Sequence, residues 1–300
     1  MELDTRVLDD AFARAAACIA EADALLVASG AGMGVDSGLP DFRGRQGFWR
    51  AYPALGRAGI DFHAAASPAA FRRDPVQAWG FYGHRLALYR RTRPHAGFAL
   101  LQDWGQRMPG GWAVFTSNVD GHFQQAGTEP AALHECHGSI HHLQCLDDCR
   151  GAIWAASDFV PEIDERHCRL LGALPRCPHC GALARPNILM FGDGDWNPQR
   201  EQVQAGRLQD WLGGLARRRA RLVVVEIGAG TAVPSVRHFV QGLQRSLKAR
   251  LVRINPGEPQ VRGAHDVAVP AGALQALQGI GARIAAAAHQ PGRPDLPQQP

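Results

Sequence analysis

The feature that most constrains the fold is a short apolar run, residues 24–29, that leads directly into the glycine-rich turn Gly30-Ala31-Gly32-Met33-Gly34. The run is apolar up to a final serine, as in a strand that is buried on both faces of a parallel sheet. Glycines after such a strand let the backbone turn tightly and approach a bound group closely. The layout therefore predicts an α/β domain in which this turn follows a buried parallel strand.

Further buried-strand signals recur along the chain, at residues 112–116, 221–227 and 250–254. The stretches between them are long enough for crossover helices, and residues 5–22 carry apolar side chains at helical intervals. We therefore expect an α/β fold with a Rossmann-like, doubly wound parallel sheet. Shorter strand character at residues 131–135 places one more strand just before His137.

Two segments break this rhythm and are interpreted as insertions that form a small domain. Residues 45–93 predict a loop and short helices, including a helix from Pro75 to Tyr89, and residues 143–186 hold cysteines among Asp, Gly and Pro. The sheet domain would then comprise residues 1–44, 94–142 and 187–288. Residues 289–300 contain four prolines and three glutamines and are expected to be disordered.

Composition narrows the class of protein. Hydrophobic residues make up 46% and charged residues 20%, as in soluble globular chains, and the net charge of +4 does not by itself predict a nucleic-acid partner. The longest apolar runs fall far short of the roughly 18–20 residues of a membrane span. The first ten residues carry four acidic side chains and one arginine, unlike a secretory signal. We expect a cytoplasmic protein with no membrane partner.

The glycine turn suits a dinucleotide, because backbone N–H groups can approach a pyrophosphate there. Alone it is a weak indication, since Val35 stands where the full dinucleotide fingerprint has its last glycine. The segment that follows, residues 36–44, is dense in turn formers and carries charges and an aromatic side chain. Such a loop favours a functional role over a mere connection.

These motifs together resemble the sirtuins, which are NAD-dependent protein-lysine deacylases. The resemblance spans roughly residues 24–280, and its blocks occur in the family's order. They are Gly30-Ala31-Gly32 with Ser37-Gly38-Leu39-Pro40-Asp41-Phe42-Arg43, Thr116-Ser117-Asn118-Val119-Asp120, His137-Gly138, Phe191-Gly192, Gly228 to Pro234, and Ile254-Asn255. The resemblance implies NAD as co-substrate and acylated protein lysines as partners, with no nucleic acid.

In sirtuin chemistry the acyl-lysine carbonyl oxygen attacks the ribose carbon that bears nicotinamide, and a histidine then acts as general base on a ribose hydroxyl. The products are nicotinamide, O-acyl-ADP-ribose and free lysine. The resemblance gives the base to His137, and an imidazole of ordinary pKa, about 6.5, is at least half neutral at working pH. It also implies that Asn118 positions the ribose or its attacking partner.

The resemblance further implies a set of binding residues. Asp120 would receive the nicotinamide carboxamide, although it also suits a plain helix cap. Asp41, Phe42 and Arg43 would cover the cofactor, with Phe42 shielding the ribose from water. Phe191 and Gly192 would lie in the substrate-binding strand. The remaining cofactor contacts are expected at Gly30, Ala31, Gly32, Ser117, Gly228 and Asn255.

Four of the seven cysteines have the spacing of a zinc site. Cys145 and Cys149 are separated by three residues, Cys177 and Cys180 by two, and twenty-seven residues lie between the pairs. Four thiolates can close tetrahedrally on Zn²⁺ and leave no open position, so the spacing predicts a structural zinc. The alternative is reduced free thiols, and Cys168 would be the substitute ligand. Cys18 is expected in a helix core and Cys136 in strand packing.

One predicted helix carries residues that concern the preference for the acyl group. Tyr82 and Arg85, at i and i+3, share a face of the predicted helix 75–89. Sirtuins that prefer succinyl or malonyl lysine have this arrangement, in which phenol and guanidinium bind the acyl carboxylate. The resemblance thus suggests an acidic-acyl preference. The alternative is an arginine on a solvated face beside a partly buried tyrosine.

Departures from the family pattern keep other functions open. The family commonly has serine or threonine at Gly34, glutamine at Ser117, and Thr-Ser where this chain has Ala229-Gly230. An altered pocket suits an ADP-ribosyltransferase or an NAD glycohydrolase on the same scaffold. From another class, a nucleic-acid-binding module could use the zinc loop with residues 217–219 and Arg221, although these arginines also fit a solvated helix end.

Overall fold

The computed structural model describes residues 5–40 and 44–288. Its main sheet has six strands in the order β11-β10-β9-β1-β2-β3, and every neighbouring pair is parallel. The strands are β1 (Ala24–Ser29), β2 (Trp112–Thr116), β3 (Leu133–Glu135), β9 (Leu222–Ile227), β10 (Arg250–Ile254) and β11 (Val267–Val269). The doubly wound α/β prediction is confirmed, with the three-residue strand β11 added at one edge.

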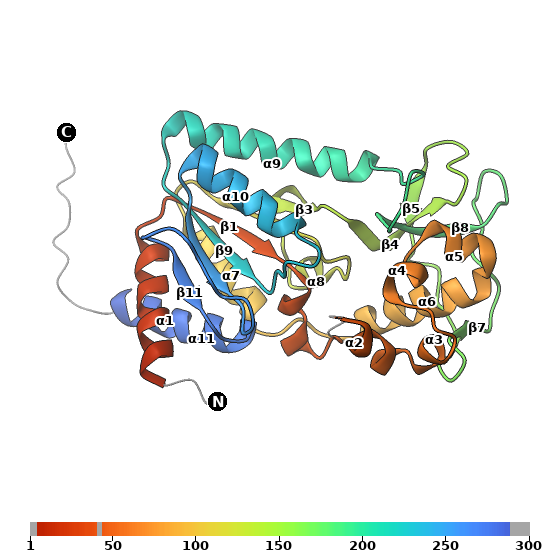
Figure 1. Cartoon of the computed structure of the whole chain (residues 1–300). Helices are drawn as coiled ribbons and strands as arrows, with labels where there is room; N and C mark the ends of the chain where they lie inside the picture. The colour runs from red at the N-terminus through yellow and green to blue at the C-terminus, as the bar shows by residue number, and fades with distance from the viewer. Residues whose placement is uncertain (1–4, 41–43, 289–300) are drawn as a thin grey trace.

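Helices cover both faces of this sheet (Figure 1). On one face lie α1 (Thr5–Ala20), α7 (Gly97–Gln106) and α11 (Ala273–Ala288), and on the other α9 (Gln199–Arg218) and α10 (Ser235–Leu247). Alternate residues of β1 serve the two layers: Leu25 and Val27 pack toward α1, α7 and α11, whereas Leu26 and Ala28 pack toward α9 and α10. All six residues of β1 are buried, as its apolar sequence predicts.

The strand order reverses between β1 and β9, and the backbones of two turns meet there. The N–H of Gly30 donates to the carbonyl of Ile227 at 2.9 Å, and the N–H of Gly32 donates to the carbonyl of Gly228 at 3.0 Å. A Cβ on Gly30 would lie 2.8 Å from the Cα of Ala229, and Gly228 has φ +61°. Only glycine allows this approach, at the place where open α/β sheets bind ligands.

A helical module follows the first glycine turn. It contains α2 (Gly44–Ala51), α3 (Pro53–Arg57), α4 (Phe62–Ala65), α5 (Pro68–Arg73) and α6 (Pro75–Arg91). Asp61, Ser67 and Asp74 each precede a helix, and their side chains accept hydrogen bonds from backbone N–H groups three residues later. Proline in the first turn of α3, α5 and α6 favours the same starts. The predicted helix 75–89 is confirmed and extends to Arg91.

A small antiparallel sheet, β5-β4-β8, lies beside the helical module. Its strands are β4 (Gly138–Cys145), β5 (Ile153–Ala155) and β8 (Ala184–Ile188), and a hairpin of β6 (Ile163–Asp164) and β7 (Arg169–Leu170) packs on α6. One apolar core joins the helices to this sheet, with Phe48, Trp79, Phe81, Ile140 and Leu143 all buried in it. The helical and cysteine-bearing segments therefore share a single core.

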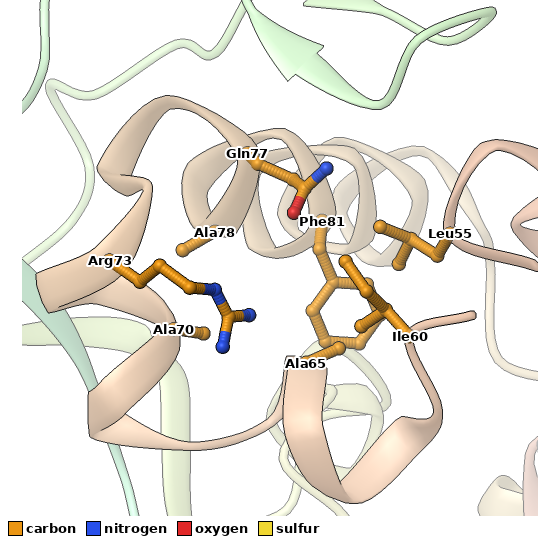
Figure 2. A pocket seen from close by; sticks show the side chains of 8 residues that line it. All are labelled: Leu55, Ile60, Ala65, Ala70, Arg73, Gln77, Ala78 and Phe81. Carbon is orange, nitrogen blue, oxygen red and sulfur yellow. The ribbon is translucent and has the colours of Figure 1, made fainter. Parts of the chain in front are cut away.

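The interior of the helical module leaves one small cavity of about 10 Å³, space for barely one water (Figure 2). Leu55, Ile60, Ala65 and Phe81 give it apolar walls, with Arg73 and Gln77 on the side of α5 and α6. Because it is too small for a ligand, it does not identify the functional site. Across the described residues, no helix is both long enough and apolar enough to traverse a membrane.

Candidate active site

The carboxyl ends of β1, β2, β3 and β9 bring the predicted site residues to one edge of the main sheet. Gly30 follows β1, Ser117 and Asn118 follow β2, His137 follows β3, and Gly228 follows β9. Parallel strands place these ends together, so residues that are far apart in the chain become neighbours.

Asn118 is fixed to the glycine turn. Its Nδ2 donates to the carbonyl of Gly30 at 3.0 Å, and its backbone N–H donates to Oγ1 of Thr116 at 3.0 Å. Thr116 Oγ1 in turn accepts from Ser29 Oγ at 2.7 Å. The Ser117 side chain makes a long contact, from its Oγ to the carbonyl of Ser29 at 3.5 Å. The asparagine amide thus has a defined orientation, whereas the short Ser117 side chain does not reach far from β1.

His137 lies two residues beyond β3, at the start of the small sheet. The Cys136 N–H donates to the carbonyl of Thr116 at 2.9 Å, and the His137 carbonyl accepts from the N–H of Leu189 at 3.0 Å. The ring Nε2 lies 3.0 Å from Oγ of Ser235. Burial lowers the pKa of His137, and a hydrogen bond to the backbone of Ser117 partly offsets this. A half-buried, predominantly neutral imidazole can accept a proton at neutral pH.

Asp120 is buried between β2 and α8 (His122–Gln125). Its Oδ1 accepts from the backbone N–H of His122 at 2.9 Å, which is the cap-like contact that the sequence also allowed. Burial raises the pKa of Asp120, while the charge of His122 and the hydrogen bond from its backbone oppose that rise. The carboxyl group therefore stabilises the start of α8 from a position four residues after the last residue of β2.

Asn255 ties two loops together on the other side of the switch point. Its Nδ2 donates to the carbonyl of Ala229 at 3.0 Å, and its Oδ1 accepts from the N–H groups of Gly257 and Glu258. Arg237 donates to the same Ala229 carbonyl at 2.8 Å. The loop after β9, which includes the predicted cofactor contact Gly228, is thus held by the asparagine and by α10.

Phe191 and Gly192 do not lie in a strand, so that expectation is wrong. Strand β8 ends at Ile188, and the two residues form a turn in which Gly192 has φ +63°. A buried ion pair explains the turn: Arg185 donates to both carboxylate oxygens of Asp193 at 2.7 and 2.9 Å. The turn still docks on the helical module, because the Phe191 N–H donates to the carbonyl of Ala66 at 2.9 Å.

Tyr82 and Arg85 are both buried in the helical module. Arg85 is 8% exposed, so the alternative of an arginine on a solvated face is wrong. Its Nε and Nη2 donate to the hydroxyl of Tyr89 at 3.0 and 2.8 Å, and its guanidinium lies over the ring of Tyr82 at 5.7 Å. Burial raises the pKa of Tyr82 to about 12, so its phenol stays protonated as a hydrogen-bond donor.

The four paired cysteines meet in space. The Sγ atoms of Cys145 and Cys180 lie 3.7 Å apart, those of Cys149 and Cys177 lie 3.6 Å apart, and all four fall within 4.8 Å of one another. Tetrahedral Zn²⁺ with Zn–S bonds of about 2.3 Å requires sulfur atoms about 3.8 Å apart, so the donor set fits zinc.

The remaining cysteines are packed apart from this cluster. Cys168 is buried in the core of the small domain and outside the cluster, which corrects its place as a substitute ligand. Cys18 lies on the buried face of α1, and Cys136 packs against the core under α9 and α10, both as expected.

Other predicted positions differ in what the structure says of them. Asp41, Phe42 and Arg43 lie outside the described residues, as does the tail 289–300. Residues 217–219 are exposed at the end of α9, and Arg221 donates to both carboxylate oxygens of Asp23. The contacts of Ser235, Tyr89 and the Arg185–Asp193 pair were not predicted. Ser235 meets His137 from 98 residues away, and no short motif marks the two local pairs, Arg85–Tyr89 and Arg185–Asp193.

Comparisons with known proteins agree with this geometry. A family model described as the Sir2 family matches residues 30–209. An NAD-dependent protein deacylase of Pyrococcus furiosus is 33% identical over 190 residues, 62% of this chain and 67% of the relative. NAD-dependent protein deacylase 2 of Pseudomonas aeruginosa is 33% identical over 180 residues, 60% of this chain and 64% of the relative. The chain thus aligns with about two thirds of their length.

The fold comparison extends the similarity to nearly the whole chain. A solved Sir2 homologue in complex with NAD superposes with a TM-score of 0.66 at 23% identity, covering 95% of this chain and 95% of the other. At this level of identity the likeness establishes the fold.

Proposed function

The chain belongs to the Sir2 family, and we propose that it is an NAD-dependent protein-lysine deacylase. It would convert acyl-lysine and NAD into free lysine, nicotinamide and O-acyl-ADP-ribose. The observation that carries the proposal is that Asn118 bonds to the carbonyl of Gly30 at the strand-order reversal, while His137 bonds to the backbone of Ser117, the residue next to Asn118. This edge combines a candidate base, an oriented amide and a backbone cradle for phosphates.

The residues of the site divide the binding of NAD between them. The backbone at Gly30, Ala31, Gly32 and Gly228 would hold the pyrophosphate, and a side chain is sterically excluded at Gly30 and Gly228. When bound, NAD supplies the ribosyl carbon that takes up the acyl oxygen and releases nicotinamide. Asn118 would orient the ribose from its fixed place beside Gly30, and Asp120 would bind the carboxamide of nicotinamide.

His137 would act as the general base. Burial keeps its pKa below the ordinary value, so Nε2 is available to take a proton from a ribose hydroxyl near pH 7. Asp41, Phe42 and Arg43 would complete the cover over the cofactor, and Ser117 and Asn255 would support it from β2 and β10. The turn at Phe191 and Gly192 would bind the peptide backbone next to the helical module.

The helical module would recognise the acyl chain. Arg85 is a buried cation held among the rings of Tyr82 and Tyr89, and a buried guanidinium gains most from a carboxylate partner. We propose that succinyl and malonyl groups are preferred to acetyl. Cys145, Cys149, Cys177 and Cys180 would bind a structural Zn²⁺ that stabilises the small sheet.

Mass spectrometry of acetyl-lysine and succinyl-lysine peptides, incubated with and without NAD, tests reaction and acyl preference together. We expect lysine, nicotinamide and O-acyl-ADP-ribose in equal amounts, only with NAD. His137→Ala should abolish turnover while the affinity for NAD stays within a few fold. Normal turnover by His137→Ala would remove the assigned base.

Ser117 gives a specific reason to measure a second activity. Its hydroxyl reaches only the carbonyl of Ser29, so the pocket lacks a long side chain at this position. Water could then take the ribosyl group, as in an NAD glycohydrolase, or another nucleophile could do so, as in an ADP-ribosyltransferase. Nicotinamide formed in excess of lysine, or ADP-ribose attached to protein, would favour this alternative.

A further inference from the structure

The imidazole of His137 is contacted by two groups from different elements. Its Nε2 lies 3.0 Å from Oγ of Ser235, the first residue of α10. It also hydrogen-bonds to the backbone of Ser117, at the end of β2. The two contacting residues lie 118 positions apart in the sequence, so only the fold brings them to the same ring.

The Ser117 contact determines where the ring proton lies. The N–H of Ser117 already donates to the carbonyl of Ser29 at 3.1 Å, so the group that faces His137 is the Ser117 carbonyl. A carbonyl only accepts, and a neutral imidazole has one N–H. Because Nε2 faces Ser235, the proton given to Ser117 is the one on Nδ1. Nε2 therefore carries the lone pair, and the Ser235 hydroxyl donates to it.

The position of Ser235 supports this arrangement. Pro234, which precedes α10, provides no side-chain cap, so the first N–H groups of the helix present partial positive charge beside the ring. That charge disfavours a protonated imidazole. Burial also lowers the pKa of His137 and the hydrogen bond to the Ser117 backbone raises it, while no charged side chain among the described residues contributes.

We infer that Ser235 is a positioning residue for His137, whose hydroxyl holds the imidazole as the Nδ1–H tautomer with the basic lone pair on Nε2. The inference rests on the proposed function, because it concerns the base of that reaction. Ser235 would not contact the acyl-lysine; it would act through the ring that it orients. The Ser235 hydroxyl would release its hydrogen bond to Nε2 of His137 when a ribose hydroxyl of NAD takes that place.

The test compares Ser235→Ala with Ser235→Thr and the matched control Ser246→Ala. Ser246 lies on the same helix, and its Oγ donates to the Gly242 carbonyl at 3.0 Å on the exposed side. Nitrogen-15 NMR of the full chain with labelled histidine, without NAD, would follow His137, identified by the signals lost in His137→Ala. The same proteins would be assayed for deacylation.

In the wild-type protein we expect an unprotonated, hydrogen-bonded Nε2. Ser235→Ala should shift that resonance toward the unbonded value and raise the pKa of His137 by about half to one unit, as loss of one hydrogen bond to the neutral form requires. The value of kcat should fall about two- to tenfold with KM for NAD within about twofold. Ser235→Thr should restore the wild-type resonance, and Ser246→Ala should match the wild type.

Two results would overturn the inference: a proton on Nε2 in the wild type, or a His137 signal and pKa in Ser235→Ala that equal those of Ser246→Ala. These outcomes are separate from the fate of the proposed function. If the wild-type protein has no NAD-dependent deacylase activity, the proposed function fails, while the NMR result still reports the state of the ring.

Discussion

Asn118 and Gly30 join the ends of two adjacent strands through one hydrogen bond, from the side-chain Nδ2 to the backbone carbonyl at 3.0 Å. The bond sets the amide oxygen of Asn118 in one orientation beside the glycine turn. Because β1 and β2 are paired residue by residue from Leu25 to Ser29, neither partner can shift without disturbing the sheet. The amide is therefore preorganised before any ligand enters.

Replacing Asn118 by Ala should remove this orientation. We expect kcat for deacylation to fall about tenfold or more, because positioning errors near the reacting sugar are costly. The unfolding free energy should fall by only about 1 kcal/mol, the cost of one hydrogen bond. Gln102→Ala is the control, since Gln102 makes only a long, exposed contact to Gly127 at 3.4 Å. Equal kcat in the two variants would contradict the role of Asn118.

Arg85 should determine acyl selectivity. Replacement by Met keeps an apolar stem in the aromatic surroundings but removes the cation, so kcat/KM for desuccinylation should fall about 10- to 100-fold, the worth of a charged hydrogen bond. Deacetylation should change only a few fold. Arg91→Met, at an exposed position near the end of the same helix, serves as control. Parallel losses on both substrates would exclude a carboxylate clamp.

The cysteine cluster should hold a metal that the small sheet needs. Cys177→Ser should reduce bound zinc, measured by elemental analysis, from about one ion per chain toward none and lower the melting temperature. Cys168→Ala removes a buried thiol outside the cluster and should retain the zinc. An unchanged melting profile with the metal lost would show that the site does not stabilise the fold.

His142 should make stability depend on pH in the acid range. Burial, with the nearby charge of Arg200, lowers its pKa from 6.5 to about 4. Between these values the unfolded chain binds a proton that the folded chain does not, so the unfolding free energy rises with pH. The contribution is complete above about pH 6.5 and is lost as pH falls to about 4, an effect of up to about 3 kcal/mol.

Urea unfolding at pH 5 and pH 7 measures this dependence. The wild-type protein should lose more stability at pH 5 than His142→Gln, which has no titrating group at this position. His238→Gln, at an exposed position of α10, should retain the wild-type slope. A wild-type slope in His142→Gln would assign the pH dependence to other groups.

Local patterns in the sequence predicted the parallel sheet and much of the edge where the site lies. The strand before Gly30 is buried along its whole length, and its apolar sequence followed directly by glycines therefore predicted it correctly as a buried strand. The cysteine cluster was predicted for a similar reason: each cysteine pair is local in the sequence, so only the contact between the two pairs depends on the fold. Strand β11 was not predicted, because its three residues are too few for a periodic signal, whereas the equally short β3 directly precedes the motif at His137.

Contacts between individual side chains could not be predicted from the sequence, even where the partners are close in the chain. The turn at Phe191 depends on the pairing of Arg185 with Asp193, and the environment of Arg85 depends on Tyr89 one helical turn later. The sequence pattern around an arginine in a helix is the same whether its side chain faces water or packs against a buried tyrosine. Tertiary packing decided between the two, as it did for the serine that faces His137.

Strand β4 begins one residue after His137 and ends at Cys145, so a single extended segment runs from the imidazole to the metal-binding knot. The register of this strand against β8 shifts between Ser139 and Leu143. A structural change in the cysteine cluster would therefore be transmitted along β4 to His137, the candidate proton acceptor. We therefore expect loss of metal from the cysteine cluster to disturb the position of His137 while the six-stranded sheet stays folded, so that the supply of zinc would limit turnover.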